Sequence, residues 1–142
     1  MKSTGKLLIG AMALGLSLPA AAATTTQSAL PQPKTENGIV YISGGIGATE
    51  AAAMKEEAKD YPLSMVFSAD KDNEYLADIR VTIKDKAGKE VLNTVSDGPI
   101  MLVKLPAGEY KVAADAKGKA LHRTVRISAK GERQLNFHWP HA

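Results

Sequence analysis

Residues 77–91 have the sequence ADIRVTIKDKAGKEV, and this stretch decides the fold class. The apolar residues at positions 77, 79, 81 and 83 alternate with polar residues, which is the pattern of a strand with one buried face. Asp85-Lys86-Ala87-Gly88 follows, with the residue types of a type I turn that ends in a left-handed glycine. The stretch therefore predicts a strand, a tight turn and the start of a second strand.

Segments of the same kind lie on both sides of this strand. Alternation predicts strands within residues 63–68, 109–114, 121–127 and 134–139, and the apolar run Ile39–Ile42 predicts another. Ile100–Val103 is apolar on both faces, so we expect a central strand or one that lies beneath a helix. The side chains that this phasing places in the core are Leu63, Phe67, Ile79, Val81, Tyr110, Val112, Val125, Leu135 and Phe137.

Glycines mark the turns between these segments. Those at positions 88, 98, 108 and 118 are spaced ten residues apart. Ser128–Gly131 and Asp115–Gly118 repeat the pattern of Asp85–Gly88, with an Asp or Ser at the start and Gly at the end. Such regular turns between short strands indicate a β-sandwich or barrel.

One helix is expected, over residues 49–60. Thr49 is the predicted N-cap, and Glu50 and Lys59 complement the helix dipole from the first and last turns. Pro62 prevents continuation. Helical spacing places a narrow apolar stripe on one face, formed by Ala51, Met54, Ala58 and Tyr61.

The stretch from Asp97 to Val112, DGPIMLVKLPAGEYKV, resembles the carboxypeptidase regulatory-like domains, which share an Asp-Gly, a strand and then Leu-Pro-x-Gly-x-Tyr. The resemblance extends upstream to Ala77 and downstream to Ile127. It implies a prealbumin-like (transthyretin-like) antiparallel β-sandwich of the seven-stranded type, in a family whose members usually lack catalytic residues and serve as structural or interaction modules. The preceding segment, from Gly44 to Phe67, lies outside that pattern. It resembles a group of small proteobacterial periplasmic proteins of unknown role.

Residues 1–23 are predicted to be a cleavable secretory signal peptide. Two early lysines precede the apolar run Leu7–Leu18, whose 12 residues fall short of the roughly 20 that a membrane-spanning helix needs. Small residues then allow cleavage after Ala23, with Ala22 as the alternative. We therefore expect a periplasmic or secreted protein with no stable membrane insertion after cleavage.

The remaining chain divides into a tether and one domain. Residues 24–36 are polar, contain Pro31 and Pro33, and predict a flexible tether, whereas residues 37–142 predict a single β-sandwich domain that includes the helix. The sequence has no cysteine, which excludes disulfides, thiolate metal sites and a lipoprotein anchor.

Charge and aromatic content argue against nucleic acid as a partner. The net charge is +3, and removal of Lys2 and Lys6 with the leader brings it to +1. Aromatic residues make up only 5% of the chain, so the basic and stacking groups of a nucleic-acid surface are lacking.

Two groups of residues are candidate ligand sites. His138 and His141 near the C-terminus, with His122 elsewhere, have imidazoles that suit Cu²⁺ or Zn²⁺, but a closed site needs about four ligands. We expect surface histidines and no metal. The Gly44–Gly47 loop precedes the helix, but Glu50 would repel an anion there, so we expect a strand-to-helix turn.

The sequence thus predicts an exported, non-enzymatic sandwich that binds a protein or another cell-envelope component through loops or an exposed strand edge. The alternative is a small-ligand binding protein of the periplasm, for a glycan or a metal ion. We expect no catalytic residues and no cofactor, because no nucleophile with a paired base appears in the sequence.

Overall fold

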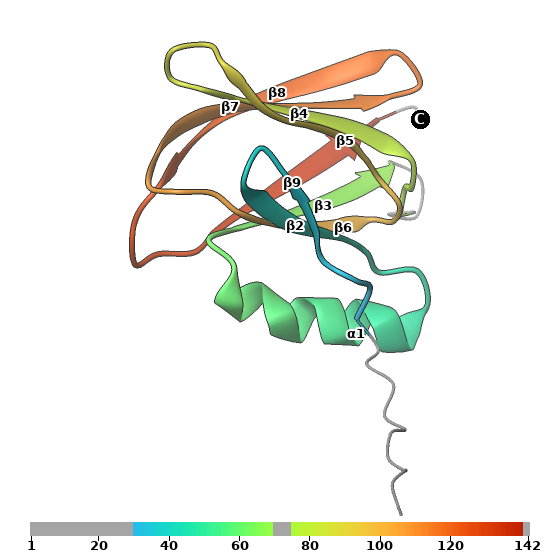
Figure 1. The fold of residues 1–142 in the computed structure, drawn as a ribbon. Coiled ribbons are helices and arrows are strands. Elements are labelled where there is room, and N and C mark those ends of the chain that lie inside the picture. The colour runs from blue at the N-terminus through green and yellow to red at the C-terminus, as the bar shows by residue number, and fades with distance from the viewer. Residues whose placement is uncertain (1–29, 70–74, 141–142) are drawn as a thin grey trace, which may run out of the picture.

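The structure, a computed structural model, describes residues 30–69 and 75–140 and is a β-sandwich with one helix outside it (Figure 1). The predicted signal peptide, His141 and the cleavage position Ala23 lie outside the described residues. The helix-side sheet has the order β1 (Lys34–Glu36), β2 (Ile39–Gly44), β6 (Ile100–Lys104), β3 (Leu63–Ala69) and β9 (Arg133–Trp139). The far sheet has the order β5 (Glu90–Ser96), β4 (Ile79–Asp85), β7 (Gly108–Ala116) and β8 (Lys119–Ile127).

The predicted fold class is confirmed, with two differences in detail. The described residues contain nine strands rather than seven. The sheets are also not wholly antiparallel, because β3 and β9 run parallel in the register from Leu63↔Arg133 to Ala69↔Trp139. A parallel pair requires a long connection, and here the whole far sheet lies between its two strands along the chain.

The main core fills the space between the sheets. Every residue predicted for the core is buried except Leu135, which is half-buried because β9 is the last strand of its sheet. Phe67, Phe137 and Trp139 form an aromatic cluster with ring centroids 5.8–6.3 Å apart. Offset aromatic contacts of this kind add to the free energy of burial.

A second, smaller core lies on the outer face of the helix-side sheet. Helix α1 (Ala48–Glu57) and the 3₁₀ turn η2 (Ala58–Asp60) place Met54 and Tyr61 there, against Ile42 and β6. Strand β6 serves both cores, because Met101 and Val103 face the far sheet whereas Ile100 and Leu102 face the helix. The two-faced apolar run predicted at 100–103 is therefore a central strand beneath a helix.

The start of α1 differs from the prediction. Gly47 rather than Thr49 occupies the N-cap, with φ of 89°, and no side chain caps the helix there. Instead the carboxylate of Glu50 reaches back and accepts hydrogen bonds from the backbone N–H groups of Gly45 (2.8 Å) and Ile46 (3.2 Å). The glycine loop is thus the predicted strand-to-helix turn, and two of its N–H donors already have a carboxylate partner.

The predicted tether is wrong for its last three residues, Lys34–Glu36, which form β1. Asn37 and Gly38 have φ of 52° and 78°, so they make the two-residue type I′ turn that pairs β1 with β2. Asn-Gly is a strong hairpin motif, and it decides the local structure despite the polar flanking residues.

Side chains join the two sheets along the sides of the sandwich. Glu36 of β1 accepts a hydrogen bond from the backbone N–H of Asn93 on β5 (2.8 Å), and Asn37 donates to the carbonyl of Val91 (3.2 Å). On the opposite side, the indole of Trp139 donates to the carbonyl of Lys119 (2.8 Å). The two contacts from the β1–β2 hairpin occupy backbone groups of β5 that a partner strand would need, which is a common protection of sheet edges.

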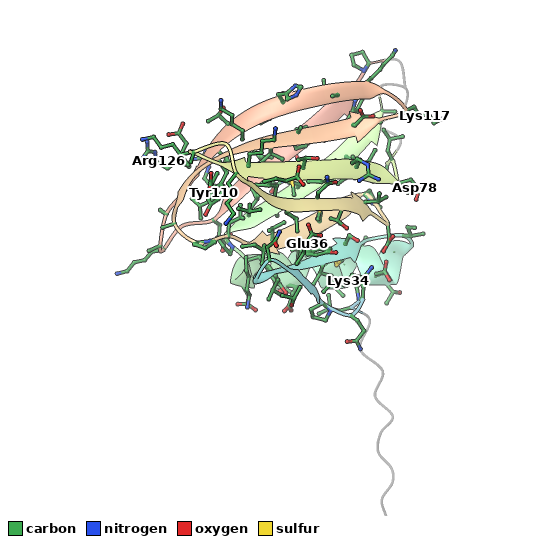
Figure 2. The ribbon with its side chains drawn as sticks, turned by 45° about the horizontal axis from the view of Figure 1, so that its top comes forward. Lys34, Glu36, Asp78, Tyr110, Lys117 and Arg126 are labelled. Carbon is green, nitrogen blue, oxygen red and sulfur yellow. The ribbon has the colours of Figure 1, made fainter. Side chains whose placement is uncertain are left out.

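The Leu-Pro-x-Gly-x-Tyr motif forms a corner at the entry to β7. The hydroxyl of Tyr110 donates to the carbonyl oxygen of Pro106 (2.9 Å), as in the tyrosine corners of other β-sandwiches. Tyr110 lies at one end of the sandwich and Lys117 at the other (Figure 2).

The predicted turns are correct in part. Gly88 has the expected left-handed φ of 89°, and its N–H donates to the carbonyl of Asp85 (2.9 Å). At the β7–β8 hairpin both Lys117 and Gly118 are left-handed, with φ of 53° and 87°, so a type I′ turn replaces the predicted type I turn. Gly131 does not adopt a left-handed φ, because the chain leaves this turn toward β9 instead of forming a tight hairpin.

Candidate functional site

The strongest candidate site is a groove between α1 and the part of the helix-side sheet that the helix leaves uncovered. Because α1 packs over β2 and β6, the outer faces of β3 and β9 extend beyond it (Figure 1). The cavity between the helix and this uncovered part of the sheet has a volume of about 530 Å³. It is lined by Gly45, Gly47, Ala48, Ala51, Lys55, Val66, Tyr75, Pro99, Ile100, Gln134 and Asn136.

The groove continues along the helix. A second hollow of about 190 Å³ shares Lys55, Val66, Ile100 and Gln134 with the first and extends it to Ala58 and Ser64. The alanines of α1 make this possible, because their small side chains leave space between the helix flank and β9. We call the two hollows together the α1–β9 groove.

The floor of the groove is apolar and its β9 wall is polar. Val66 and Ile100 form the floor, and Gln134 and Asn136, two residues apart on β9, form the wall. The Nε2 of Gln134 donates to the Oδ1 of Asn136 (3.2 Å). That bond leaves the Oε1 of Gln134 as an acceptor and the Nδ2 of Asn136 as a donor for a ligand.

The rim carries one cation and one aromatic ring. Lys55 projects from the last turn of α1, and no ion pair joins it to another residue in the part of the chain that the structure describes. Tyr75 is 61% exposed and adjoins β3 through a bridge with Ser68. These groups can orient and hold a ligand by hydrogen bonding, stacking and charge.

The histidines considered from the sequence are not brought together. His138 lies on the outer face of β9, as expected, with its Nδ1 3.1 Å from the hydroxyl of Ser68. His122 lies on β8 of the far sheet. Within residues 30–69 and 75–140, no group of three His, Cys, Asp or Glu side chains could hold a metal ion.

The two tyrosines whose pKa values are raised lie outside the groove. Burial raises the pKa of Tyr61 and Tyr110, and nearby carboxylates add to both shifts. Tyr61 packs in the second core, with the ammonium of Lys104 5.1 Å from its ring centroid, and Tyr110 makes the corner with Pro106. The raised pKa values of these two tyrosines therefore belong to side chains that pack within the fold and not to groove residues.

The α1–β9 groove was not predicted from the sequence, although its parts were visible there. The sequence indicates the narrow, Ala-rich apolar stripe of the helix. It does not indicate how much of the sheet one short helix leaves uncovered. Gln134 and Asn136 were recognised only as the polar positions of a strand. Whether these two side chains line a groove depends on which strand lies beside β3, and the alternation pattern does not specify that strand.

Comparisons with known proteins do not assign the chain to a family. No family model and no curated protein matches the sequence. Among solved structures, the chain is similar to a variant of BcpA, the major pilin subunit of Bacillus cereus, with 16% identity and a TM-score of 0.42. The similarity covers 54% of this chain and only 28% of the pilin chain. In the described part of the chain, no helix combines the length and apolar character that a membrane span requires.

Proposed function

We propose that the chain is an exported, non-enzymatic β-sandwich module that binds an extended segment of a cell-envelope protein in the α1–β9 groove. The observation that carries this proposal is the pair of side-chain amides, Gln134 and Asn136, beside an apolar floor. Export rests on the predicted signal peptide at residues 1–23.

The spacing of the two amides suits a peptide backbone. Residues two apart on a strand are separated by about 6.6 Å, which is also the repeat of an extended peptide. A side-chain amide has a donor and an acceptor, like the peptide group itself. An extended segment in the groove can therefore hydrogen-bond to β9 while alternate side chains contact Val66 and Ile100.

The length and charge of the groove define the segment further. Helix α1 has 10 residues, which corresponds to about 15 Å, or four to five residues of extended chain. Lys55 is the only charged side chain among the groove-lining residues of the described chain. An acidic residue in the bound segment would pair with it, so we expect a preference for acidic or neutral segments.

Site-specific photo-crosslinking in the native host tests the proposal. A photoreactive residue at Ala48 or Ser64, both of which line the groove, should yield one crosslinked protein, whereas the same residue at Lys86, in the β4–β5 turn, should not. A synthetic peptide from the crosslinked site should bind the purified chain, and the double variant Gln134→Ala/Asn136→Ala should weaken that binding. Equal crosslinking at Lys86, or a peptide that does not bind, would contradict the proposal.

A glycan is the second candidate, and Tyr75 is the observation that favours it. Its exposed ring stands at the rim of a groove with two amides, and these groups can contact the apolar face and the hydroxyls of a sugar. A thermal-shift panel of sugars would show stabilisation lost in Tyr75→Ala. Including Cu²⁺ and Zn²⁺ tests the metal alternative, which depends on His138 and His141.

Kinship with the carboxypeptidase regulatory-like domains is also part of the proposal. Two contacts support this relationship, because each explains why a particular residue type is needed at one position of the shared motif. Tyr110 closes the corner at Pro106, and Gly98 crosses Gly44 so closely that an added Cβ would clash with the Gly44 carbonyl oxygen. A set of aligned homologues that kept Gly98 and Tyr110 together would support the relationship.

A further inference from the structure

A separate hollow lies on the opposite side of the molecule, on the outer face of the far sheet. It has a volume of about 320 Å³ and is lined by Thr82, Lys84, Lys111, Val112, Ala113 and His122. Three of these six residues have basic side chains, and all three are exposed. We call it the Ala113 hollow, because the small side chain of Ala113 leaves the space that its larger neighbours surround.

The strand register brings the basic residues together. Lys84 of β4 and Lys111 of β7 are directly opposite each other, and His122 of β8 is directly opposite Ala113. Thr82 faces Ala113 from β4. Directly opposed residues on antiparallel strands have Cβ atoms about 5 Å apart, so these donors surround one small area of the sheet.

The two lysines, Lys84 and Lys111, form no ion pair within the described residues, although carboxylates occupy neighbouring positions. Glu90 lies opposite Lys84 across the bulge in the β4–β5 ladder, where its carboxylate accepts a hydrogen bond from Asn93 (3.2 Å). Glu109, two residues before Lys111 on β7, is ion-paired with Arg126 (3.9 Å). Asp115, farther along β7, accepts from the N–H of Gly118 (2.8 Å).

The usual explanation for lysines on a sheet does not apply here. Lysines often protect edge strands from pairing with other chains, but β4 and β7 are the two central strands of the far sheet. Like charges directly opposite each other on neighbouring strands are destabilising. An anion bound between Lys84 and Lys111 would remove that repulsion.

We propose that the Ala113 hollow binds a phosphate group. The ammonium groups of Lys84 and Lys111 supply charge and several donors each, and the Thr82 hydroxyl and the His122 imidazole supply further hydrogen bonds. The group can belong to free phosphate or to the headgroup of an anionic phospholipid, which have this chemistry in common. The site is independent of the α1–β9 groove, which lies on the other sheet.

Titration of the purified full chain with inorganic phosphate, followed by backbone amide NMR, tests the proposal. We expect saturable shifts confined to the neighbouring segments of β4, β7 and β8. The double variant Lys84→Gln/Lys111→Gln should raise the dissociation constant by about tenfold or more, because it removes two charged donors. The double variant Lys86→Gln/Lys130→Gln loses the same charge from exposed turns and should bind phosphate as the parent chain does.

A second measurement identifies the source of the phosphate group and guards against misfolding. Flotation with vesicles of phosphatidylglycerol, against phosphatidylcholine vesicles, should show charge-dependent binding lost in Lys84→Gln/Lys111→Gln if the group is a lipid headgroup. Without phosphate, that variant should melt at or above the temperature of the parent chain, since the repulsion is gone. Absence of both phosphate and vesicle binding, or equal loss of binding in the control variant, would overturn the proposal.

Discussion

The hydroxyl of Tyr110 donates a hydrogen bond to the carbonyl oxygen of Pro106, four residues earlier, at 2.9 Å. The ring itself is almost completely buried, with 7% of the residue exposed. One side chain thus contributes to the core and fixes the direction in which the chain enters β7.

Replacing Tyr110 by Phe removes this hydrogen bond and keeps the ring. We expect the free energy of unfolding to fall by about 1 kcal/mol, the usual net value of such a bond. Urea denaturation of the two proteins measures the difference. Tyr75→Phe is the control, since this exposed hydroxyl should change the free energy of unfolding by less than about 0.5 kcal/mol.

The same residue gives the stability a pH dependence. Burial raises the pKa of Tyr110 above the ordinary value of 10.0, and the charge of Asp85 adds to the shift. The folded state therefore holds the phenolic proton more tightly than the unfolded chain. Its contribution to stability is complete below pH of about 10 and is lost as the pH rises through the raised pKa.

We therefore expect the free energy of unfolding to fall more steeply above this pH in the parent chain than in Tyr110→Phe. A series of urea titrations across alkaline pH would measure it. Tyr61, whose pKa burial also raises, remains in both proteins and sets the common background. Parallel curves for the two proteins would contradict the assignment to Tyr110.

Gly98→Ala should be strongly destabilising. The new Cβ would clash with the carbonyl group of Gly44, so two backbone segments would have to move apart. We expect a loss of about 3 kcal/mol in the free energy of unfolding. Gly88→Ala provides the comparison, because it meets open space and strains only a left-handed φ, at about 1 kcal/mol.

Glu50→Ala should loosen the start of the helix without disturbing the sandwich. The N–H groups of Gly45 and Ile46 lose their carboxylate partner, and the helix N-terminus loses a favourable charge. We expect faster amide hydrogen exchange at Gly45 and Ile46 and a loss of about 1 kcal/mol in the free energy of unfolding. Glu56→Ala, which breaks only an exposed ion pair with Lys59, should cost much less.

The predicted leader has its own direct test. Intact mass and N-terminal sequencing of the protein recovered from the host envelope should give a chain that begins at Thr24, or at Ala23 if cleavage follows Ala22. Ala23→Arg should slow processing, because the peptidase accepts small residues at this position. A mature chain that still carries residues 7–18 would show that the leader is not removed.

Strand phasing was the part of the fold that the sequence predicted well. Alternation depends on which face of each strand is buried, and Ile79, Val81 and Val112 were placed correctly for that reason. The two-faced run at Ile100–Val103 was predicted to be a central strand or a strand beneath a helix, and it is both. The order of the strands did not follow from alternation, because pairing between β3 and β9 joins residues 70 positions apart, such as Phe67 and Phe137.

The boundaries and the site were harder to predict because each depends on a specific local contact. Thr49 was a reasonable N-cap by residue type, but Glu50 satisfies the loop donors and lets the helix begin earlier, at Ala48. Asn37-Gly38 outweighed the polar composition around it. The α1–β9 groove arises from how far one helix extends over a sheet, which is a property of tertiary packing.

The late position of β9 along the chain has a consequence for folding during synthesis, which proceeds from the N-terminus. Strand β3 is made long before its partner β9, so the strand edge that pairs with β9 has no partner until the far sheet has been made. Folding to completion depends on release of the last described strand, and contacts of such long range form slowly. During that interval the incomplete chain presents an apolar strand edge, and binding of a chaperone to that edge would have the most effect.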